Sequence, residues 1–265
     1  MDTLRTVWET FFDPQAMAEA LPDMLRVGLR NTLVLALASA VLGTVLGLLL
    51  AMAGLARTRW LRWPARLYTD LFRGLPVAVT ILLVGVGFAP IGLALWGPNP
   101  YPLGILALGL VAAAYMGEIF RSGIQSVETG QLEASRALGF SHWQAMRLVI
   151  VPQGVRRVLP AWVNQLIALV KDSSLVYFLG LLASQRELFR IGQDYAANTG
   201  NASALVLAGL LYLVITVPLT HAVNAVDRRL REGRPAGGAA DDLDTPHPPG
   251  GVDPVLTAVS EGASR

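Results

Sequence analysis

Residues 31–56 read NTLVLALASAVLGTVLGLLLAMAGLA, a run without a charged side chain. A helix that crosses the hydrocarbon core of a membrane needs about 20 apolar residues, and this run is long enough. Two further runs lack charges, at residues 74–117 and 195–226, and the first of these has room for two spans and a turn. The sequence therefore predicts an all-α integral membrane protein with several spans.

The composition agrees with lipid as the solvent. Charged residues make up 15% of the 265 residues, whereas soluble domains carry about 25%. The chain has no cysteine, which excludes disulfides, thiolate metal sites and a cysteine nucleophile. The three histidines have no metal-like spacing, so we predict no metal site at His142, His221 or His247.

Working outward from the uncharged runs, we predict five transmembrane helices, at about residues 28–56, 74–96, 102–120, 158–181 and 204–225. Gly43 and Gly47 form a small-xxx-small pair that lets another helix approach the first span closely. The chain breakers of residues 97–100, Gly-Pro-Asn-Pro, separate the second span from the third. Residues 182–203 are predicted to be a short hydrophilic loop.

The two ends of the chain are polar. Residues 1–27 carry several acids and lack a continuous apolar core, so they do not resemble a cleaved signal peptide. They fit either an amphipathic surface helix or a flexible terminus, and both readings stay open. Residues 227–265 form a tail rich in Gly, Pro, Ala and Asp, and residues 233–265 are predicted to be disordered.

Most arginines lie on one side of this predicted arrangement. They occupy two predicted loops, at residues 57–73 and 121–157, and the start of the tail. The positive-inside rule makes that side cytoplasmic. The N-terminal lead-in at 1–27 is therefore expected outside and the tail at 227–265 in the cytoplasm.

The long cytoplasmic segment 121–157 contains the sequence ETGQLEASRALG at residues 128–139. Good helix formers precede Gly139, which can adopt the left-handed conformation that ends a helix. Ser141 and Gln144 have the spacing of a capping box for a second helix, which Pro152 is expected to stop. Such a rigid knob can seat in a groove of a partner protein, or it can be an ordinary loop packed on its own chain.

The same residues resemble a known signature. Permease subunits of bacterial ATP-binding-cassette importers carry Glu-Ala-Ala, three residues, Gly, nine residues, Ile, one residue and Leu-Pro. Residues 133–135 match its opening with Ser135 in place of Ala, and Gly139 falls at the required spacing. Val149 stands for Ile, and residues 151–152 read Val-Pro instead of Leu-Pro.

Other segments resemble the polar amino-acid branch of that family, which includes histidine, glutamine and arginine types. They are the residues Ala114 to Ile124, the Lys-Asp-Ser-Ser-Leu of 171–175 and the Arg-Gly-Leu-Pro of 73–76. In the last two, Ser173 and Leu75 each stand where the branch has Thr. The resemblance covers about residues 28–226.

The resemblance implies a type I importer transmembrane domain at 28–226 with a cytoplasmic coupling loop at 121–157. The chain would be the permease subunit of an ATP-driven amino-acid uptake system in the bacterial cytoplasmic membrane. Its implied partners are a second permease subunit, identical or not, two ATP-binding subunits that hold ATP and Mg, and an extracytoplasmic amino-acid-binding protein. The chain lacks a Gly-rich phosphate loop of the Walker type, so it is not expected to be an enzyme.

Two sets of site residues follow. The ATPase-coupling set is Gly130, Gln131, Glu133, Ala134, Arg136, Leu138 and Gly139, although Glu133 and Arg136 can instead pair with each other on one helix face. The substrate-pathway or gate set is Glu118, Lys171, Asp172 and Ser173, since charges inside a span should face other helices or a hydrated cavity. Arg121, one turn away, is an alternative ion-pair partner for Glu118, and Arg73 fits an interface anchor.

Two other classes of function compete with this interpretation. A secondary transporter would show internal repeats and intramembrane carboxylates for ion coupling, and it would not need the segment 130–139. A membrane enzyme would show a site such as His-Glu-x-x-His or Gly-x-Ser-x-Gly, and the sequence has neither.

Overall fold

The computed structural model describes residues 2–232, which contain no strand. Residues up to Asp227 form one compact unit. The long helices of the described residues are α3 (Leu29–Leu55), α4 (Arg59–Gly74), α7 (Tyr101–Gln125), α10 (Val151–Asp172) and α12 (Ser203–Glu232). The shorter elements are α1 (Asp2–Phe11), α2 (Pro14–Asp23), η1 (Met24–Gly28), α5 (Val77–Gly87), α6 (Ala89–Trp96), α8 (Thr129–Ala137), α9 (His142–Ala145), η2 (Met146–Ile150), η3 (Ser173–Leu179), η4 (Ala183–Gln185) and α11 (Leu188–Thr199). The predicted all-α class is confirmed.

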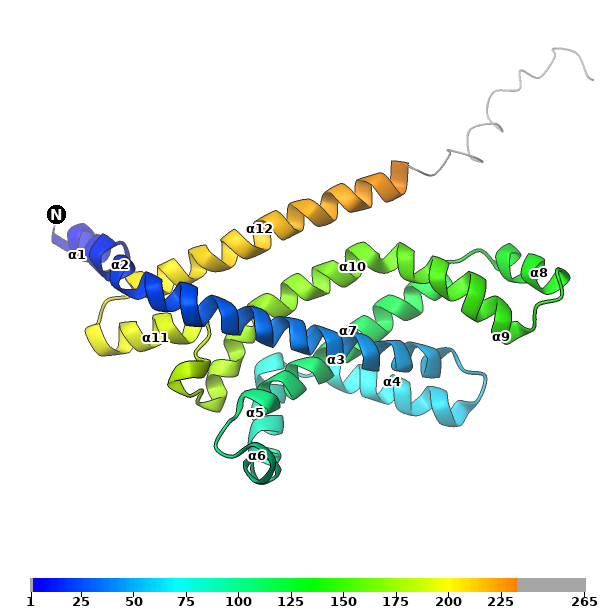
Figure 1. The fold of residues 1–265 in the computed structure, drawn as a ribbon, viewed down its shortest axis with the longest axis horizontal. Helices are drawn as coiled ribbons and strands as arrows, with labels where there is room; N and C mark the ends of the chain where they lie inside the picture. Colours follow the sequence, from blue (N-terminus) through cyan, green and yellow to red (C-terminus); the bar gives the residue numbers. More distant parts are fainter. Residues whose placement is uncertain (1, 233–265) are drawn as a thin grey trace, which may run out of the picture. The chain divides into compact units, whose positions relative to one another are not determined.

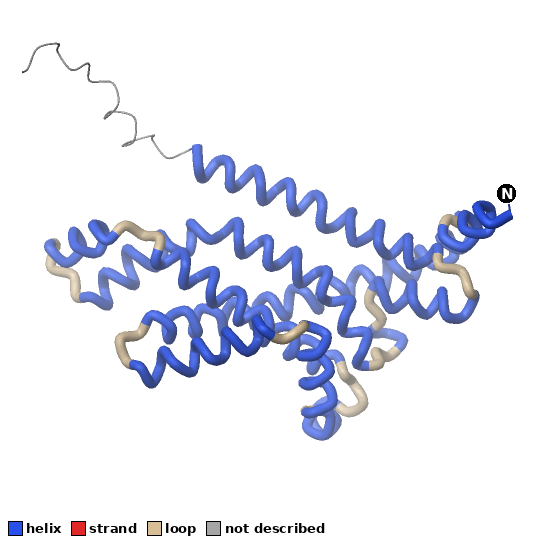
Figure 2. The backbone as a smooth tube through the Cα atoms, turned by 180° about the vertical axis from the view of Figure 1, so that it is seen from behind, coloured by secondary structure: helices blue, strands red, loops and turns tan. Residues whose placement is uncertain are grey.

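The centre of this unit is the pair α3 and α7, which run side by side (Figures 1 and 2). A Cβ atom added at Gly43 would lie 2.5 Å from Cβ of Ala112, and one added at Gly47 would lie 2.9 Å from the backbone nitrogen of Gly117. Only glycine allows these backbones to come so close. The helix-packing role predicted for Gly43 and Gly47 is therefore confirmed.

The predicted second span at 74–96 is wrong as a single helix. Residues 77–96 form the two short helices α5 and α6, and at about 1.5 Å per residue neither can cross a core of about 30 Å. The basic segment expected to be a loop at 57–73 is instead the helix α4. It meets α5 at an angle of 109° across Leu75 and Pro76. Pro76 has no N–H to continue the first helix, and the residue before a proline is driven toward extended backbone.

Three helical segments of the described range are long and apolar enough to cross a membrane, or four if the bent pair α4–α5 forms one span. The predicted fourth span, 158–181, corresponds to α10 and η3. It is not among them, because α10 carries Arg156, Arg157, Lys171 and Asp172. Five is therefore an approximate number.

The predicted hydrophilic loop at 182–203 contains the helix α11, which is a further correction. Leu188 and Ile191 of α11 pack with Ala20 and Met24 of the lead-in and with Ala204 of α12 in a small apolar cluster. The lead-in is helical, and Ser203 Oγ accepts a hydrogen bond of 2.9 Å from the backbone N–H of Asp13. Of its two readings the structure favours a helix, and this helix packs on α11 and α12.

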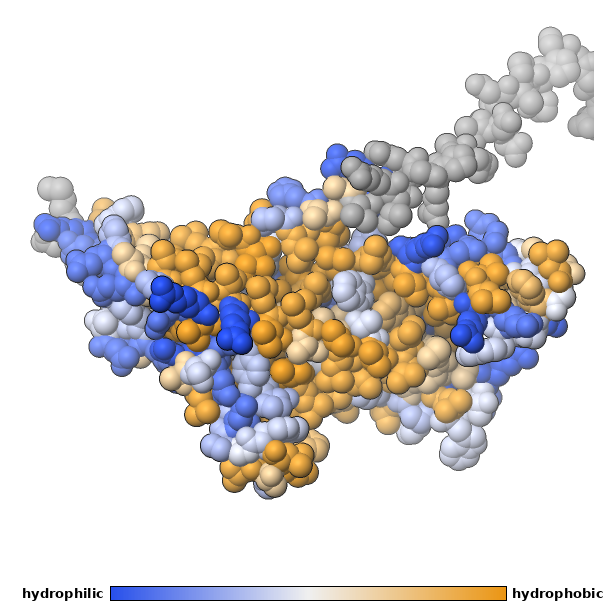
Figure 3. All heavy atoms as spheres, in the orientation of Figure 1, coloured by the Kyte–Doolittle hydropathy of each residue, from blue (hydrophilic) through white to orange (hydrophobic). Residues whose placement is uncertain are grey.

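Figure 3 shows how polarity is distributed on one face. Apolar residues form a band across the middle, and hydrophilic residues gather toward the ends. Several exposed side chains of α3 are apolar, among them Val41, Val45 and Leu49. Exposed apolar surface of this kind is what a lipid solvent requires. The predicted disordered segment 233–265 lies outside the described residues.

Candidate functional site

The segment predicted to form a knob consists of α8, α9 and the turn between them, at the opposite end of the unit from α1 and α2 (Figure 1). A small apolar cluster holds its base. Ile124 from the end of α7, Val127 from the turn after it and Ile150 from η2 are buried there, and Leu132 of α8 packs against them. Arg157 also donates a hydrogen bond to the carbonyl of Ser126. The knob is thus fixed to α7 and α10.

The turn after α8 depends on Gly139, whose φ of +88° lies in the left-handed region. Phe140 N–H donates to Ser135 O at 3.2 Å, and Gly139 N–H donates to Arg136 O at 3.0 Å. These two bonds are the Schellman motif that satisfies the last carbonyls of a helix. The predicted glycine stop is confirmed. Ser135, the departure from the family signature, donates its hydroxyl to Gln131 O at 2.7 Å and so stays satisfied although buried.

The second helix of the knob begins with the predicted capping box. Gln144 N–H donates to Ser141 Oγ at 3.2 Å, and Ser141 N–H donates to Gln144 Oε1 at 2.8 Å. The expected stop at Pro152 is wrong. The chain continues from α9 through the π-turn η2 into α10, and Pro152 lies in the first turn of α10, directly after this π-turn.

All seven predicted coupling residues are exposed. Arg136 donates to Phe140 O at 2.8 Å, and no salt bridge joins it to Glu133 within residues 2–232. Two large apolar side chains project from this polar segment, Leu138 with 79% of its surface exposed and Trp143 with 66%. Trp143 was not among the predicted site residues, although an aromatic residue directly after a helix cap in a polar stretch was the available signal.

Glu118 lies in α7 within a cluster of arginines. Arg121 Nε and Nη2 donate to its two carboxylate oxygens at 2.9 and 2.6 Å. Arg73, in the last turn of α4, approaches the same carboxylate at 3.8 Å and stacks over the ring of Tyr115. The ion-pair alternative for Glu118 is therefore confirmed, and Arg73 joins α4 to α7.

The other three predicted pathway residues lie where α10 changes into the 3-10 helix η3. Ser173 is fully buried and donates to Val170 O at 2.7 Å, so it stabilises the change of helix type and faces no open space. Asp172 is half-buried, while Lys171 is exposed and forms no salt bridge within the described part of the chain. Lys171 is the member of this set that is free to meet a ligand or another subunit.

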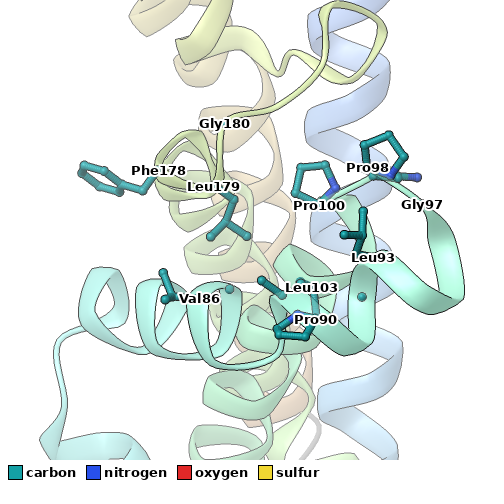
Figure 4. Close-up of a pocket in the computed structure, with 14 residues that line it drawn as sticks. Val86, Pro90, Leu93, Gly97, Pro98, Pro100, Leu103, Phe178, Leu179 and Gly180 are labelled. Atoms are coloured by element: carbon teal, nitrogen blue, oxygen red, sulfur yellow. The ribbon is translucent and has the colours of Figure 1, made fainter.

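A hollow of about 690 Å³ lies between α5, α6, the 97–100 turn and η3 (Figure 4). Its lining includes Val86, Pro90, Leu93, Leu103, Phe178 and Leu179, and it contains no charged side chain. The ammonium and carboxylate groups of an amino acid would lose hydration there without a charged partner. The hollow therefore suits an apolar occupant and is not a convincing amino-acid site.

Comparison with known proteins gives the family. Residues 43–232 match the binding-protein-dependent transport system inner membrane component. The chain belongs to this family. It is a permease subunit of an ATP-binding-cassette importer, and in such importers ATP hydrolysis is carried out by separate subunits.

The relatives extend the match over most of the chain. The arginine transport system permease protein of Bacillus subtilis (strain 168) is 34% identical over 83% of this chain and 97% of its own length. The glutamate/aspartate import permease protein of Escherichia coli O6:H1 is 35% identical over 82% and 98%. A crystal structure of an amino acid ABC transporter with histidines superposes with a TM-score of 0.72 at 31% identity, covering 82% of this permease and 98% of that chain.

Proposed function

We propose that this permease carries amino acids and that its knob is the contact through which ATPase subunits drive it. Relatives named for arginine and for glutamate and aspartate match it about equally well. These substrates share an α-ammonium and an α-carboxylate and differ in side-chain charge. The proposal is therefore the amino-acid class, delivered by an extracytoplasmic binding protein.

The single observation that carries the coupling proposal is the Gly139 turn. A left-handed glycine fixes the angle between α8 and α9, and Leu138 next to it is exposed on a polar surface. Exposed apolar side chains at the tip of a rigid element are typical anchors in a protein interface. The base of the knob is packed on α7 and α10. A movement of its tip would therefore also move these two helices.

In this proposal the arginine-rich end that carries the knob is cytoplasmic and the lead-in 1–27 is outside. Two permease subunits pair around the pathway, in two-fold symmetry or a pseudo-symmetric equivalent. Two ATPases that close on ATP move the two knobs. ATP can shift the equilibrium between the inward-open and outward-open states only as far as it binds one state more tightly than the other.

The pathway proposal centres on Lys171. Its ammonium is exposed within α10 and has no salt-bridge partner among residues 2–232, which is unfavourable in lipid. A gate at the subunit interface, or a hydrated pathway, gives it a polar environment. Asp172 beside it and the change of helix type at Ser173 fit a hinge for such a gate. Glu118 is assigned to the ion pair with Arg121 in preference to substrate binding.

The experiment is co-purification of the membrane-extracted permease with its ATPase. We compare wild type with Gly139→Asp and use Gly200→Asp as the matched control. Gly200 also has a positive φ, +72°, and also has no atom near its absent Cβ, but it ends α11 at the other end of the unit. Both variants carry the same backbone strain, of order 1 kcal/mol, and the same added charge.

We expect Gly139→Asp to lose the ATPase and Gly200→Asp to retain it. Both variants should stay folded by circular dichroism. Retention of the ATPase by a folded Gly139→Asp protein would contradict the coupling proposal. Amino-acid uptake that needs no ATP and no ATPase would contradict the whole mechanism and favour ion-coupled transport.

A further inference from the structure

The first two turns of α4 form a basic and aromatic surface that has no role in the transport mechanism proposed above. Its side chains enclose a hollow of about 580 Å³ lined by Arg59, Trp60, Arg62, Trp63, Pro64 and Arg66. Trp60 is 88% exposed and Trp63 66% exposed. We call these six residues the α4 patch.

The charge of the α4 patch is only partly balanced within the unit, where Arg66 interacts electrostatically with Glu118. None of its three arginines forms a salt bridge within residues 2–232, and Asp70 is the only acid in α4. A cluster of three cations without a salt-bridge partner carries an excess of positive charge and is complementary to an external anion. Guanidinium groups pair with phosphate through a planar fork of donors, and this makes a phosphate group the best match.

The apolar part of the helix indicates what carries that phosphate. Ala65 and Thr69 are buried against the rest of the unit, and Tyr68 donates to Leu110 O of α7 at 2.8 Å. The exposed side of α4 then continues from Trp60 and Trp63 through Leu67 and Leu71, each about half exposed or more. Tryptophan prefers the level of the lipid headgroups, and leucine prefers the acyl chains.

The α4 patch lies at the same end of the unit as α8 and α9 in both ribbon views (Figures 1 and 2). We propose that it is a binding site for an anionic phospholipid in the leaflet next to the knob. The arginines hold the phosphate, and the lipid chains lie along the Trp60–Leu71 stripe. A bound lipid would fix α4 beside the bend that leads to α5.

The test is native mass spectrometry of the full-length permease assembled with its partner subunits, titrated with phosphatidylglycerol or phosphatidylcholine. One basic residue near an anionic surface contributes about fivefold in affinity, so we expect wild type to prefer phosphatidylglycerol at least about tenfold. The triple variant Arg59→Gln, Arg62→Gln, Arg66→Gln should lose this preference. In the single variant Arg66→Gln, the preference for phosphatidylglycerol should fall about fivefold. This variant replaces the triple variant in the test if the triple variant fails to assemble.

The matched control removes three exposed arginines from the other end of the unit, Arg5→Gln, Arg26→Gln and Arg30→Gln. It carries the same loss of charge and should keep the preference within about twofold, because screening confines the interaction to about 10 Å. Equal loss in both triple variants, or no preference in wild type, would overturn the proposal.

A second arm asks whether another subunit covers the surface. The chain has no cysteine, so Trp60→Cys introduces a single thiol. We expect no disulfide between subunits in the assembled transporter under mild oxidation. Efficient cross-linking of the two permeases through position 60 would identify a second permease as the occupant and overturn the lipid assignment.

Discussion

Tyr212 donates its hydroxyl hydrogen to Oε2 of Glu187 at 2.9 Å, and this bond ties the long helix α12 to the start of α11. Glu187 is completely buried. Its carboxylate also accepts the backbone N–H groups of Phe189 and Arg190, both at 2.6 Å, and so caps α11. Next to it, Leu188 N–H donates to Thr32 Oγ1 of α3 at 3.2 Å. The Glu187 carboxyl thus joins α11 to α12, and the adjacent Leu188 N–H joins α11 to α3.

We predict that Glu187 makes stability depend on pH. Burial raises the pKa of this carboxyl from its ordinary 4.5 to about 7, against the hydrogen bonds from Tyr212, Phe189 and Arg190 that lower it. The folded state therefore holds this proton more tightly than the unfolded state. Its stabilising contribution is present below pH 4.5 and is lost as the pH rises through about 7. At most roughly 3 kcal/mol is involved.

The measurement is the thermal unfolding midpoint of the purified protein at pH 6 and pH 8. Wild type should unfold at a lower temperature at pH 8, and Glu187→Gln should remove most of that difference. Glu9→Gln, which changes an exposed carboxylate, should leave it unchanged. An unaltered pH difference in Glu187→Gln would show that other groups cause it.

A second prediction concerns the contact between α3 and α7. Gly43→Ala places a Cβ 2.5 Å from that of Ala112, so the helices must separate, and we expect a loss of about 1–3 kcal/mol in stability. Gly54→Ala in the same helix is the control, because its Cβ would meet only Arg121 Cδ at 3.7 Å. The unfolding midpoints of the two variants give the comparison, and equal values would mean that the close approach is not essential.

The features predicted correctly from the sequence are those that depend on near neighbours in the chain. The Gly139 turn and the Ser141–Gln144 box are each formed within six residues, so local chemistry determines them. The pairing of Glu118 with Arg121 is likewise one helical turn apart. The uncharged runs predicted α3, α7 and α12 because lipid requires apolar side chains over the whole length of a span.

The errors arose where distant segments decide the structure. The arginines of 57–73 indicated a loop, but Ala65 and Thr69 pack on the unit and make α4 an amphipathic helix with its charges turned outward. Glu187 lies in the segment 182–203, which was predicted to be a hydrophilic loop. Its actual partner Tyr212 is 25 residues away, and nothing in the local sequence indicates that contact.

A third prediction tests the ion-pair assignment of Glu118 by a double-mutant cycle. Glu118→Gln leaves two arginines without their anion, and Arg121→Gln leaves the carboxylate with the more distant Arg73 and Arg66. For an interacting pair, we expect the double variant to lose less unfolding free energy than the two single variants lose together. The difference should be about 0.5–3 kcal/mol. Two results together would contradict this assignment: additive losses of stability, and a loss of uptake in Glu118→Gln but not in Arg121→Gln. They would support a role for Glu118 in the substrate pathway.

The final prediction concerns Lys171, which is exposed on α10 one residue before the half-buried Asp172. If its ammonium meets a partner in the pathway or at the gate, the positive charge matters more than the shape of the side chain. Lys171→Ala should therefore abolish most uptake while the protein still assembles, and Lys171→Arg should retain a substantial part. Radiolabelled amino-acid uptake into proteoliposomes gives the readout, with ATPase co-purification as the check on assembly. Normal uptake by Lys171→Ala would contradict both the gate and the pathway role. It would indicate instead a lipid-exposed lysine whose long side chain carries its ammonium group to the membrane surface.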